Sequence, residues 1–190
     1  MSNKIIIHIC GPSGSGKTVI GKKLKKRFGN KITVKDIDTL RAQFIKKHYG
    51  NNRIEVFDKI AYQKYIDNYC DAHKDKPLIF VGLNHMPWWH KNHYYNMHPT
   101  HKYFIELDDD IILQQKCKRF LSNIKSKQDM DYLVKHNEKF IKNVSEVIAR
   151  EACNQKENNK LNAIWRKAYK KQGYIFLSRE NIFKQVCAKL

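Results

Sequence analysis

The chain has 190 residues, of which 42% are hydrophobic and 29% charged. This length suits one domain with a sizeable core, and this hydrophobic content argues against an intrinsically disordered chain. The formal charge of +19 leaves two interpretations open. It could attract nucleic acid or a phosphorylated substrate, or it could reflect codon bias and solubility, because 30 of the 37 basic residues are Lys.

No apolar run is long enough to span a bilayer, and residues 1–4 followed by an apolar strand do not resemble a signal peptide. We therefore expect no membrane partner. The scattered cysteines form no C-x-x-C pair, which predicts free thiols in a cytoplasmic or other reducing compartment. These cysteines are Cys10, Cys70, Cys117, Cys153 and Cys187.

The first predicted strand, residues 4–10, is an apolar β-branched run typical of a buried parallel strand. Residues 11–18, GPSGSGKT, then fit the phosphate-binding pattern G-x-x-x-x-G-K-[ST]. A basic helix with one apolar stripe follows, and we expect it to end at Gly29. Strand, loop and helix together predict a nucleoside triphosphate site.

Each residue type of this loop suits that chemistry. The glycines let backbone N–H groups approach a polyphosphate that a Cβ would obstruct. Lys17 brings a charge to the β- and γ-phosphates, and the Thr18 hydroxyl can ligate Mg²⁺. ATP is favoured over GTP because no N-K-x-D segment is present, so we expect ATP and Mg²⁺ as cofactors. The predicted nucleotide-binding residues are Gly11, Ser13, Gly14, Ser15, Gly16, Lys17 and Thr18.

Strands and helices alternate along the rest of the chain. Further strands are predicted at 31–36, 77–83, 102–107 and 173–177. Helices are predicted at 39–48, 54–73, 130–148 and 161–171 and from 108 onward, with a polar bend at 154–159 and Ser178 capping a last helix. This alternation predicts an α/β fold whose parallel sheet is covered on both faces, with ligands at the carboxyl ends of its strands.

This arrangement resembles the small P-loop kinases, which include nucleoside and nucleotide kinases, shikimate and gluconate kinases and polynucleotide 5′-kinases. The resemblance rests on the loop, on the D-x-D of Asp36 and Asp38 after the second predicted strand, and on five strands in 190 residues. It covers residues 4–41 by motif, extends to the helix at 108–120 and is topological elsewhere.

The resemblance implies a three-layer α/β/α fold with a five-stranded parallel sheet in the order 2-3-1-4-5. It also implies a single P-loop kinase-like domain over residues 1–190. Within that domain it places acceptor-binding helices at 39–73 and a lid at 108–135.

The acidic residues after the second strand carry specific roles in these families. Asp36 matches the acid that helps hold hydrated Mg²⁺, and Asp38 matches the acid that contacts the acceptor hydroxyl and acts as its base. The alternative for Asp38 is the N-cap of the following helix. Arg41 completes a D-x-x-R, which in polynucleotide kinases grips an acceptor phosphate.

Family lids carry arginines that neutralise the transferring phosphoryl group. Lys116 and Arg119 stand nearest to that pattern, although their spacing departs from R-x-x-x-R, and Arg150 is a weaker alternative. The alternative is a solvated basic helix face. Asn84 follows the third strand where many P-loop enzymes have an acid, so it could bind substrate or the γ-phosphate, or only end the strand. Either Asp36 then serves the metal instead, or the metal site is weakened.

Residues 84–101 are rich in His, Trp and Tyr. Three interpretations compete for this segment. They are a metal site that includes His90 and His93, aromatic stacking on a nucleobase, and a loop packed over the sheet.

The sequence as a whole predicts an Mg²⁺- and ATP-dependent phosphotransferase that acts on a hydroxyl or phosphate of a small acceptor, a nucleoside or nucleotide. One alternative is a polynucleotide 5′-kinase, which the basic charge and the D-x-x-R support. Another is a nucleotide-binding switch without transferase activity, which the unusual end of the third strand keeps open.

Overall fold

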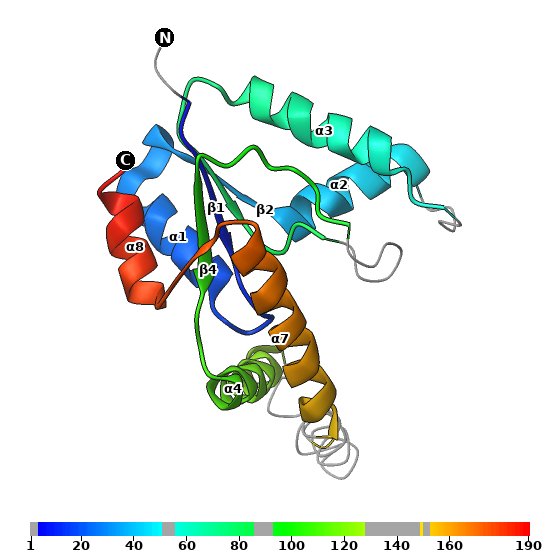
Figure 1. The fold of residues 1–190 in the computed structure, drawn as a ribbon, viewed down its shortest axis with the longest axis vertical. Coiled ribbons are helices and arrows are strands. Elements are labelled where there is room, and N and C mark those ends of the chain that lie inside the picture. Colours follow the sequence, from blue (N-terminus) through cyan, green and yellow to red (C-terminus); the bar gives the residue numbers. More distant parts are fainter. Residues whose placement is uncertain (1–3, 51–55, 86–92, 128–148, 150–152) are drawn as a thin grey trace. The chain divides into compact units, whose positions relative to one another are not determined.

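The structure is a computed structural model, and it divides into two compact units. It describes residues 4–50, 56–85, 93–127, 149 and 153–190, with the backbone alone for 119–127 (Figure 1). The first of the two units, which we call the sheet unit, comprises Met1–Gly11, Gly16–Glu106 and Tyr169–Leu190. The second unit, which we call the helical unit, comprises Pro12–Ser15 and Leu107–Ala168.

The sheet unit is built on five parallel strands in the order β2-β3-β1-β4-β5, which confirms the predicted order. Ile7 of the central strand pairs with Ile79 on one side and His101 on the other. The strands are β1 (Ile6–Cys10), β2 (Thr33–Asp36), β3 (Leu78–Val81), β4 (His101–Ile105) and β5 (Ile175–Leu177). Because all strands run in one direction, the ends of β1, β2 and β3 lie at the same edge of the sheet.

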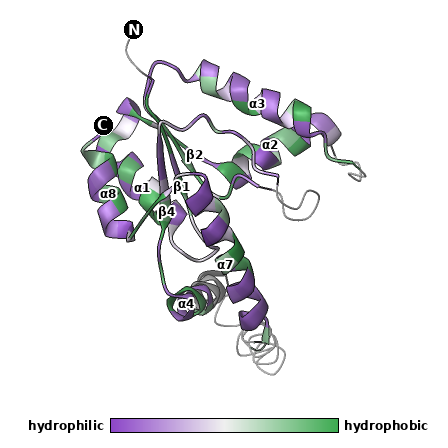
Figure 2. Ribbon diagram, viewed as in Figure 1, coloured by the Kyte–Doolittle hydropathy of each residue, from purple (hydrophilic) through white to green (hydrophobic). Residues whose placement is uncertain are grey.

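Two pairs of helices cover the two faces of this sheet. One pair is α1 (Lys17–Phe28) with α8 (Arg179–Cys187), and the other is α2 (Ile37–Tyr49) with α3 (Lys59–Ala72). Successive side chains of a strand point to opposite faces, so Ile6 packs with α2 and α3 while Ile7 packs with α1 and α8. Figure 2 shows hydrophobic and hydrophilic residues alternating along these helices, as expected where one helix face is buried.

Three helix ends test the sequence predictions. Gly29 ends α1 with a positive φ of 55°, and the Ser178 hydroxyl accepts the N–H of Asn181 at the start of α8, so both predicted caps are confirmed. The N-cap alternative for Asp38 is wrong. Asp36 caps α2 by accepting the N–H of Asp38 at 2.9 Å, and the helix begins at Ile37, two residues before its predicted start.

The helical unit contains α4 (Asp109–Lys127) and the first part of α7 (Gln155–Lys171). The bend predicted at 154–159 is wrong, because α7 begins at Gln155 and the N–H of Asn158 donates to the Asn154 carbonyl at 2.8 Å. The polar side chains of α7 bind those of α4, with Asn162 and Arg166 both donating to Asp109 at 2.8 Å. These side-chain bonds, together with the backbone hydrogen bonds of the helix, stabilise a helix in a polar sequence.

Two general findings concern the parts of the chain that the structure describes. All five cysteines lie in those parts, and none forms a disulfide. No described helix combines the length and the apolar character needed to cross a bilayer. The helix predicted at 130–148 lies outside the described residues.

Candidate functional site

The glycine loop, residues 11–18, follows β1 directly and leads into α1. Gly14 and Gly16 have φ angles of 88° and 89°, which residues with a Cβ rarely adopt. Gly16 is the N-cap of α1, and its carbonyl accepts the N–H of Ile20 at 3.2 Å. Helix α1 therefore begins at this loop, and the positive end of its dipole lies there.

Lys17 is the first residue of α1, and its side chain folds back over the start of the loop. Its Nζ donates a hydrogen bond to the Gly11 carbonyl at 2.8 Å. This contact lies within the sheet unit. It keeps a positive charge beside the backbone of the loop.

Thr18 and Asp36, the predicted metal ligands, lie side by side in the sheet unit. The Thr18 hydroxyl lies 3.5 Å from Oδ2 of Asp36, the last residue of β2. Hydroxyl and carboxylate oxygens are ligands of the kind that Mg²⁺ prefers. Among the described residues, no group of three or more His, Cys, Asp or Glu could hold a metal ion. A magnesium ion needs fewer protein ligands than that, because it keeps several waters and binds substrate phosphates.

Arg179, which the sequence predictions did not include, lies beside the glycine loop. A Cβ built on Gly16 would lie 2.9 Å from both Cδ and Nη1 of Arg179, so the arginine lies directly against the start of α1. Arg179 is the first residue of α8, just after β5, at the edge of the sheet where the strands end. Its place after a predicted strand was the only sequence signal. Arg179 brings a further positive charge to the glycine loop.

Asp38 and Arg41 form an ion pair on the first turns of α2. Nη1 of Arg41 lies 3.1 Å from Oδ1 of Asp38, whose side chain is 75% exposed. Nη2 of Arg41 donates to the carbonyls of Leu83 at 3.2 Å and His85 at 3.1 Å. The guanidinium therefore links α2 to the segment after β3, and it holds the exposed carboxylate of Asp38 in place.

Asn84, a predicted substrate-binding residue, is buried in the segment that follows β3. Its Nδ2 donates to the Tyr95 carbonyl at 2.6 Å, and its Oδ1 accepts from the Tyr169 hydroxyl at 2.6 Å. Burial, reinforced by the charge of Arg41, lowers the pKa of the neighbouring His85 to about 4. The Asn84 amide is thus engaged inside the sheet unit.

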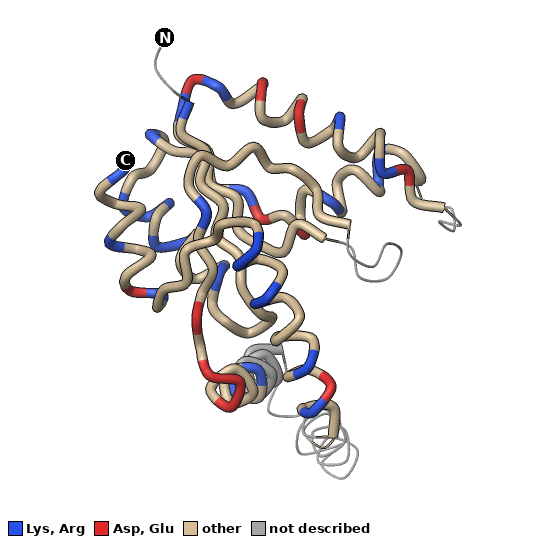
Figure 3. Tube along the Cα trace, viewed as in Figure 1, with Lys and Arg blue, Asp and Glu red and all other residues tan. Residues whose placement is uncertain are grey.

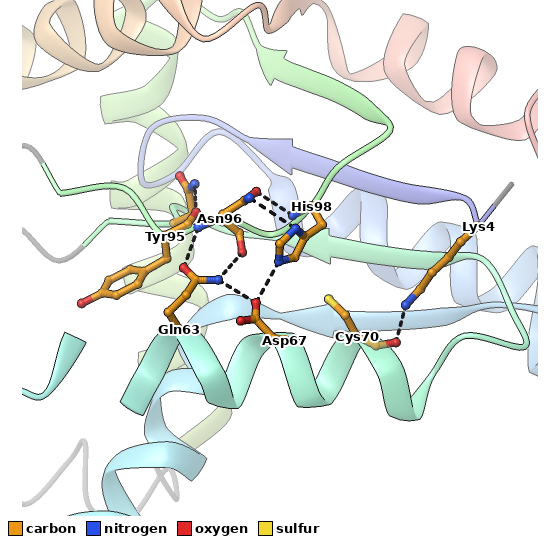
Figure 4. A network of polar contacts seen from close by, with 8 residues as sticks. Lys4, Gln63, Asp67, Cys70, Tyr95, Asn96 and His98 are labelled. Atoms are coloured by element: carbon orange, nitrogen blue, oxygen red, sulfur yellow. Dashed lines mark hydrogen bonds and ion pairs between the residues drawn. The ribbon is translucent and has the colours of Figure 1, made fainter. Parts of the chain in front are cut away.

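The described part of residues 84–101 packs over the sheet unit. Tyr95 and Met97 are buried in the core with α2 and α3. Figure 4 shows how this stretch of chain is tied to α3: the N–H of Asn96 donates to Gln63 at 2.9 Å, and His98 lies 2.8 Å from Asp67. These contacts fit the interpretation of a packed loop. His90 lies outside the described residues.

The predicted lid residues belong to the helical unit. A Cβ on Gly14 would lie 2.9 Å from Cγ of Lys116, so Lys116 packs against the loop segment of its own unit. Ser15 is fully buried there, and its hydroxyl has no hydrogen-bond partner among the described residues. A buried polar atom of this kind is unusual in a native protein and fits a ligand-binding loop. Arg119 lies in α4 with its backbone alone described, and Arg150 lies outside the described residues.

His8 supports the end of β3 from the middle of β1. Its Nε2 donates to the Gly82 carbonyl at 3.0 Å, so its Nδ1 accepts from the Tyr174 hydroxyl at 2.6 Å. Burial lowers the pKa of His8 to about 4, which keeps the ring neutral. Gly82 itself has a φ of 137°, and a Cβ there would lie 2.9 Å from Cβ of Ile37. In the sequence, this histidine stands out only as part of an apolar strand.

The sequence matches no protein-family model, and no curated protein matches it. Solved structures similar to this chain include an uncharacterized protein from Eubacterium ventriosum, with 13% identity, a TM-score of 0.45 and coverage of 98% of both chains. They also include an unliganded sugar kinase from a Janibacter species, with 18% identity and a TM-score of 0.38. That similarity covers 67% of this chain and 69% of the kinase. We therefore infer the chemistry of the candidate site from the residues of this chain and not from these structures.

Proposed function

We propose that this chain is a phosphotransferase of the small P-loop kinase class. It would move the γ-phosphoryl group of ATP, with Mg²⁺, to a small acceptor, a nucleoside or nucleotide. The observation that carries the proposal is the grouping of Lys17, Thr18 and Asp36 around the glycine loop at the edge of the sheet where β1 and β2 end. A cation for the phosphates, with a hydroxyl and a carboxylate for Mg²⁺, is the combination that phosphoryl transfer from ATP uses.

The polyphosphate would bind along the glycine loop. Backbone N–H groups at the start of α1 point at bound anions, and the helix dipole favours negative charge there. Lys17 would exchange its bond to the Gly11 carbonyl for the β- and γ-phosphates, and Arg179 would add a further charge-assisted hydrogen bond. The unsatisfied Ser15 hydroxyl supports a ligand at this loop.

Thr18 and Asp36 would hold the magnesium ion. Mg²⁺, when bound, would neutralise negative charge on the phosphates. Asp36 also caps α2, so its carboxylate is oriented by the backbone of that helix before any metal binds. Such prior orientation lowers the cost of forming the site.

Asp38 is proposed as the base for a hydroxyl acceptor. The acceptor oxygen attacks the γ-phosphorus, its proton passes to the Asp38 carboxylate, and the bond from the γ-phosphorus to the bridging oxygen of ADP breaks. A phosphate acceptor is already ionised and needs no proton transfer. Lys116 and Arg119 are proposed to stabilise the charge on the transferring group, as the resemblance implies.

Arg41 is assigned a positioning role in this proposal. Its guanidinium bonds to Asp38 and to two backbone carbonyls, at 3.1 to 3.2 Å. A guanidinium held in this way fixes the direction of the Asp38 carboxylate. This differs from the grip on an acceptor phosphate that the D-x-x-R pattern implies.

The experiment is a measurement of ATP consumption with Mg²⁺ against nucleosides, nucleoside monophosphates, small hydroxylated metabolites and 5′-hydroxyl oligonucleotides. We expect one nucleoside or nucleotide to stimulate turnover strongly and Lys17→Ala to abolish it without loss of fold. Lys22→Ala, an exposed lysine on the same helix, is the matched control and should retain turnover.

Other results of the panel would overturn this proposal in distinct ways. Phosphorylation of oligonucleotides alone would favour the polynucleotide 5′-kinase. ATP binding with only slow hydrolysis and no stimulated acceptor would favour a nucleotide-dependent switch. Unchanged turnover in Lys17→Ala would exclude the glycine loop as the catalytic site.

A further inference from the structure

The two helices on one face of the sheet carry a strong excess of positive charge. Helix α1 contains six Lys or Arg and no Asp or Glu, and α8 contains two basic residues and one acid. Lys17 and Arg179 lie at the glycine loop, which leaves five basic residues of α1 and one of α8 for this face. We propose that this α1–α8 face, which we call the basic face, binds the phosphate backbone of a nucleic acid. The proposal is independent of phosphotransferase activity.

The opposite face of the same sheet is close to balanced in charge. Helices α2 and α3 together are longer, yet they contain five Lys or Arg and three Asp or Glu. Figure 3 shows basic residues along α1 and α8, and mixed signs along α3. Codon bias would raise the lysine content of both faces alike. The difference therefore reflects where the charge is placed, and it favours a specific polyanion partner over bias alone.

The lysines of α1 must face outward because the helix buries its other side. Ile20 and Leu24 pack against the sheet, which leaves Lys22, Lys23 and Lys26 exposed. Lys22 and Lys26 are one helical turn apart, about 6 Å along the axis. A row of cations at this spacing can contact several phosphates of one nucleic-acid backbone.

The charges of α1 and α8 lie close enough to act on one another. Glu180, the single acid of the basic face, pairs with Lys184 at 2.9 Å. The pKa of Glu180 is lowered chiefly by Lys184 and also by Lys23, which lies on α1. The one negative charge is therefore neutralised by its neighbours, and the net field of the face stays positive.

A nucleic acid fits this face better than an anionic membrane. Helices that lie on membranes insert an apolar face into the lipid, whereas the apolar faces of α1 and α8 pack against the sheet. Among the exposed large hydrophobic residues of the described chain, Val19 is the one that these two helices contribute. Because lysine contacts phosphates as a point charge, we expect binding with little dependence on base sequence.

The test compares two variants of equal net charge in the full chain. Lys22→Gln/Lys23→Gln/Lys26→Gln removes three charges from the basic face. The control, Lys46→Gln/Lys47→Gln/Lys64→Gln, removes three exposed charges from α2 and α3. Glutamine and lysine have similar helix propensities, so both variants should fold, which thermal unfolding can verify.

Fluorescence anisotropy with a labelled DNA duplex at several salt concentrations gives the readout. We expect the basic-face variant to lose about tenfold or more in affinity and its salt slope to fall by roughly 2 to 3. The control variant should stay within about twofold of the wild type. Lys→Arg at the same three positions of α1 should retain binding, because arginine also pairs with phosphate.

Three results would overturn the proposal. Equal weakening by both variants would mean that net charge alone attracts DNA. No binding of duplex or single-stranded DNA or RNA at low salt would exclude a nucleic-acid partner. Binding of phosphatidylserine vesicles without binding of nucleic acid would instead point to a membrane surface. ATP binding by the same variants is measured in parallel, so a failure here leaves the proposed phosphotransferase untouched.

Discussion

The Thr18 hydroxyl lies 3.5 Å from one carboxylate oxygen of Asp36, and the other oxygen of Asp36 caps α2. The same carboxylate therefore serves the proposed metal and the helix that carries Asp38. These two roles can be separated by mutation, because asparagine caps helices as well as aspartate does but is a weaker ligand for Mg²⁺.

We predict that Asp36→Asn leaves the free energy of unfolding nearly unchanged while about tenfold more Mg²⁺ is needed for half-maximal turnover. Asp36→Ala should show the same metal defect and lose about 1 kcal/mol of stability as well. Magnesium titrations of turnover, with urea unfolding of each variant, measure both effects. Asp58→Asn is the matched control, since Asp58 caps α3 in the same way, accepting the N–H of Ala61 at 2.9 Å. An unaltered magnesium requirement in Asp36→Asn would contradict the metal assignment.

Arg179 offers a test of the nucleotide site that does not depend on turnover. We predict that Arg179→Ala lowers the affinity for ATP and ADP about tenfold, the loss of one charge-assisted hydrogen bond of about 1.5 kcal/mol. Isothermal titration calorimetry measures this effect. Lys184→Ala is the control, because Lys184 lies on the same helix and pairs with the exposed Glu180. Equal affinities in the two variants would show that Arg179 does not contact the nucleotide.

The order of strands, the glycine loop and the Thr18–Asp36 pair were all predictable from the sequence. The strands and the glycine loop follow from local signals, namely short apolar runs and a fixed spacing of glycines. The order of the strands and the pairing of Thr18 with Asp36 were implied by the resemblance to the small P-loop kinases. Arg179 was missed because its contact with Gly16 joins residues far apart in the chain. The helical start of α7 was missed for a related reason. Its polar residues favour a loop locally, and bonds to Asp109 stabilise the helix instead.

Substitution of Arg41 can show whether this residue positions Asp38 or binds the acceptor. We predict that Arg41→Ala lowers kcat about tenfold to a hundredfold and leaves KM for the acceptor within about twofold, because a misplaced base slows chemistry without weakening binding. Steady-state kinetics with the stimulated acceptor measures both constants. Arg41→Lys should recover part of kcat if it restores the charge beside Asp38. A raised KM with unchanged kcat would instead assign Arg41 to an acceptor phosphate.

Acid should destabilise the sheet unit through its buried histidines. The pKa of His8 is about 4 in the folded chain because of burial, and it is near 6.5 in an unfolded one. Between these values the unfolded state binds more protons, so the free energy of unfolding falls as the pH drops from about 6.5 to 4, by about 3 kcal/mol for His8 alone. His85 acts in the same direction, since its pKa is also lowered to about 4.

Urea unfolding at pH 7.5 and at pH 5 measures this dependence. We expect His8→Gln to be less stable at pH 7.5 than the wild type but to lose less stability on acidification. Tyr174→Phe is the control, because it removes the hydroxyl that lies 2.6 Å from Nδ1 of His8 and keeps the burial that lowers the pKa. Asp67 and Asp109, whose pKa values are lowered by their partners, act below this pH window. An identical pH dependence in His8→Gln and in the wild type would show that His8 does not titrate with unfolding.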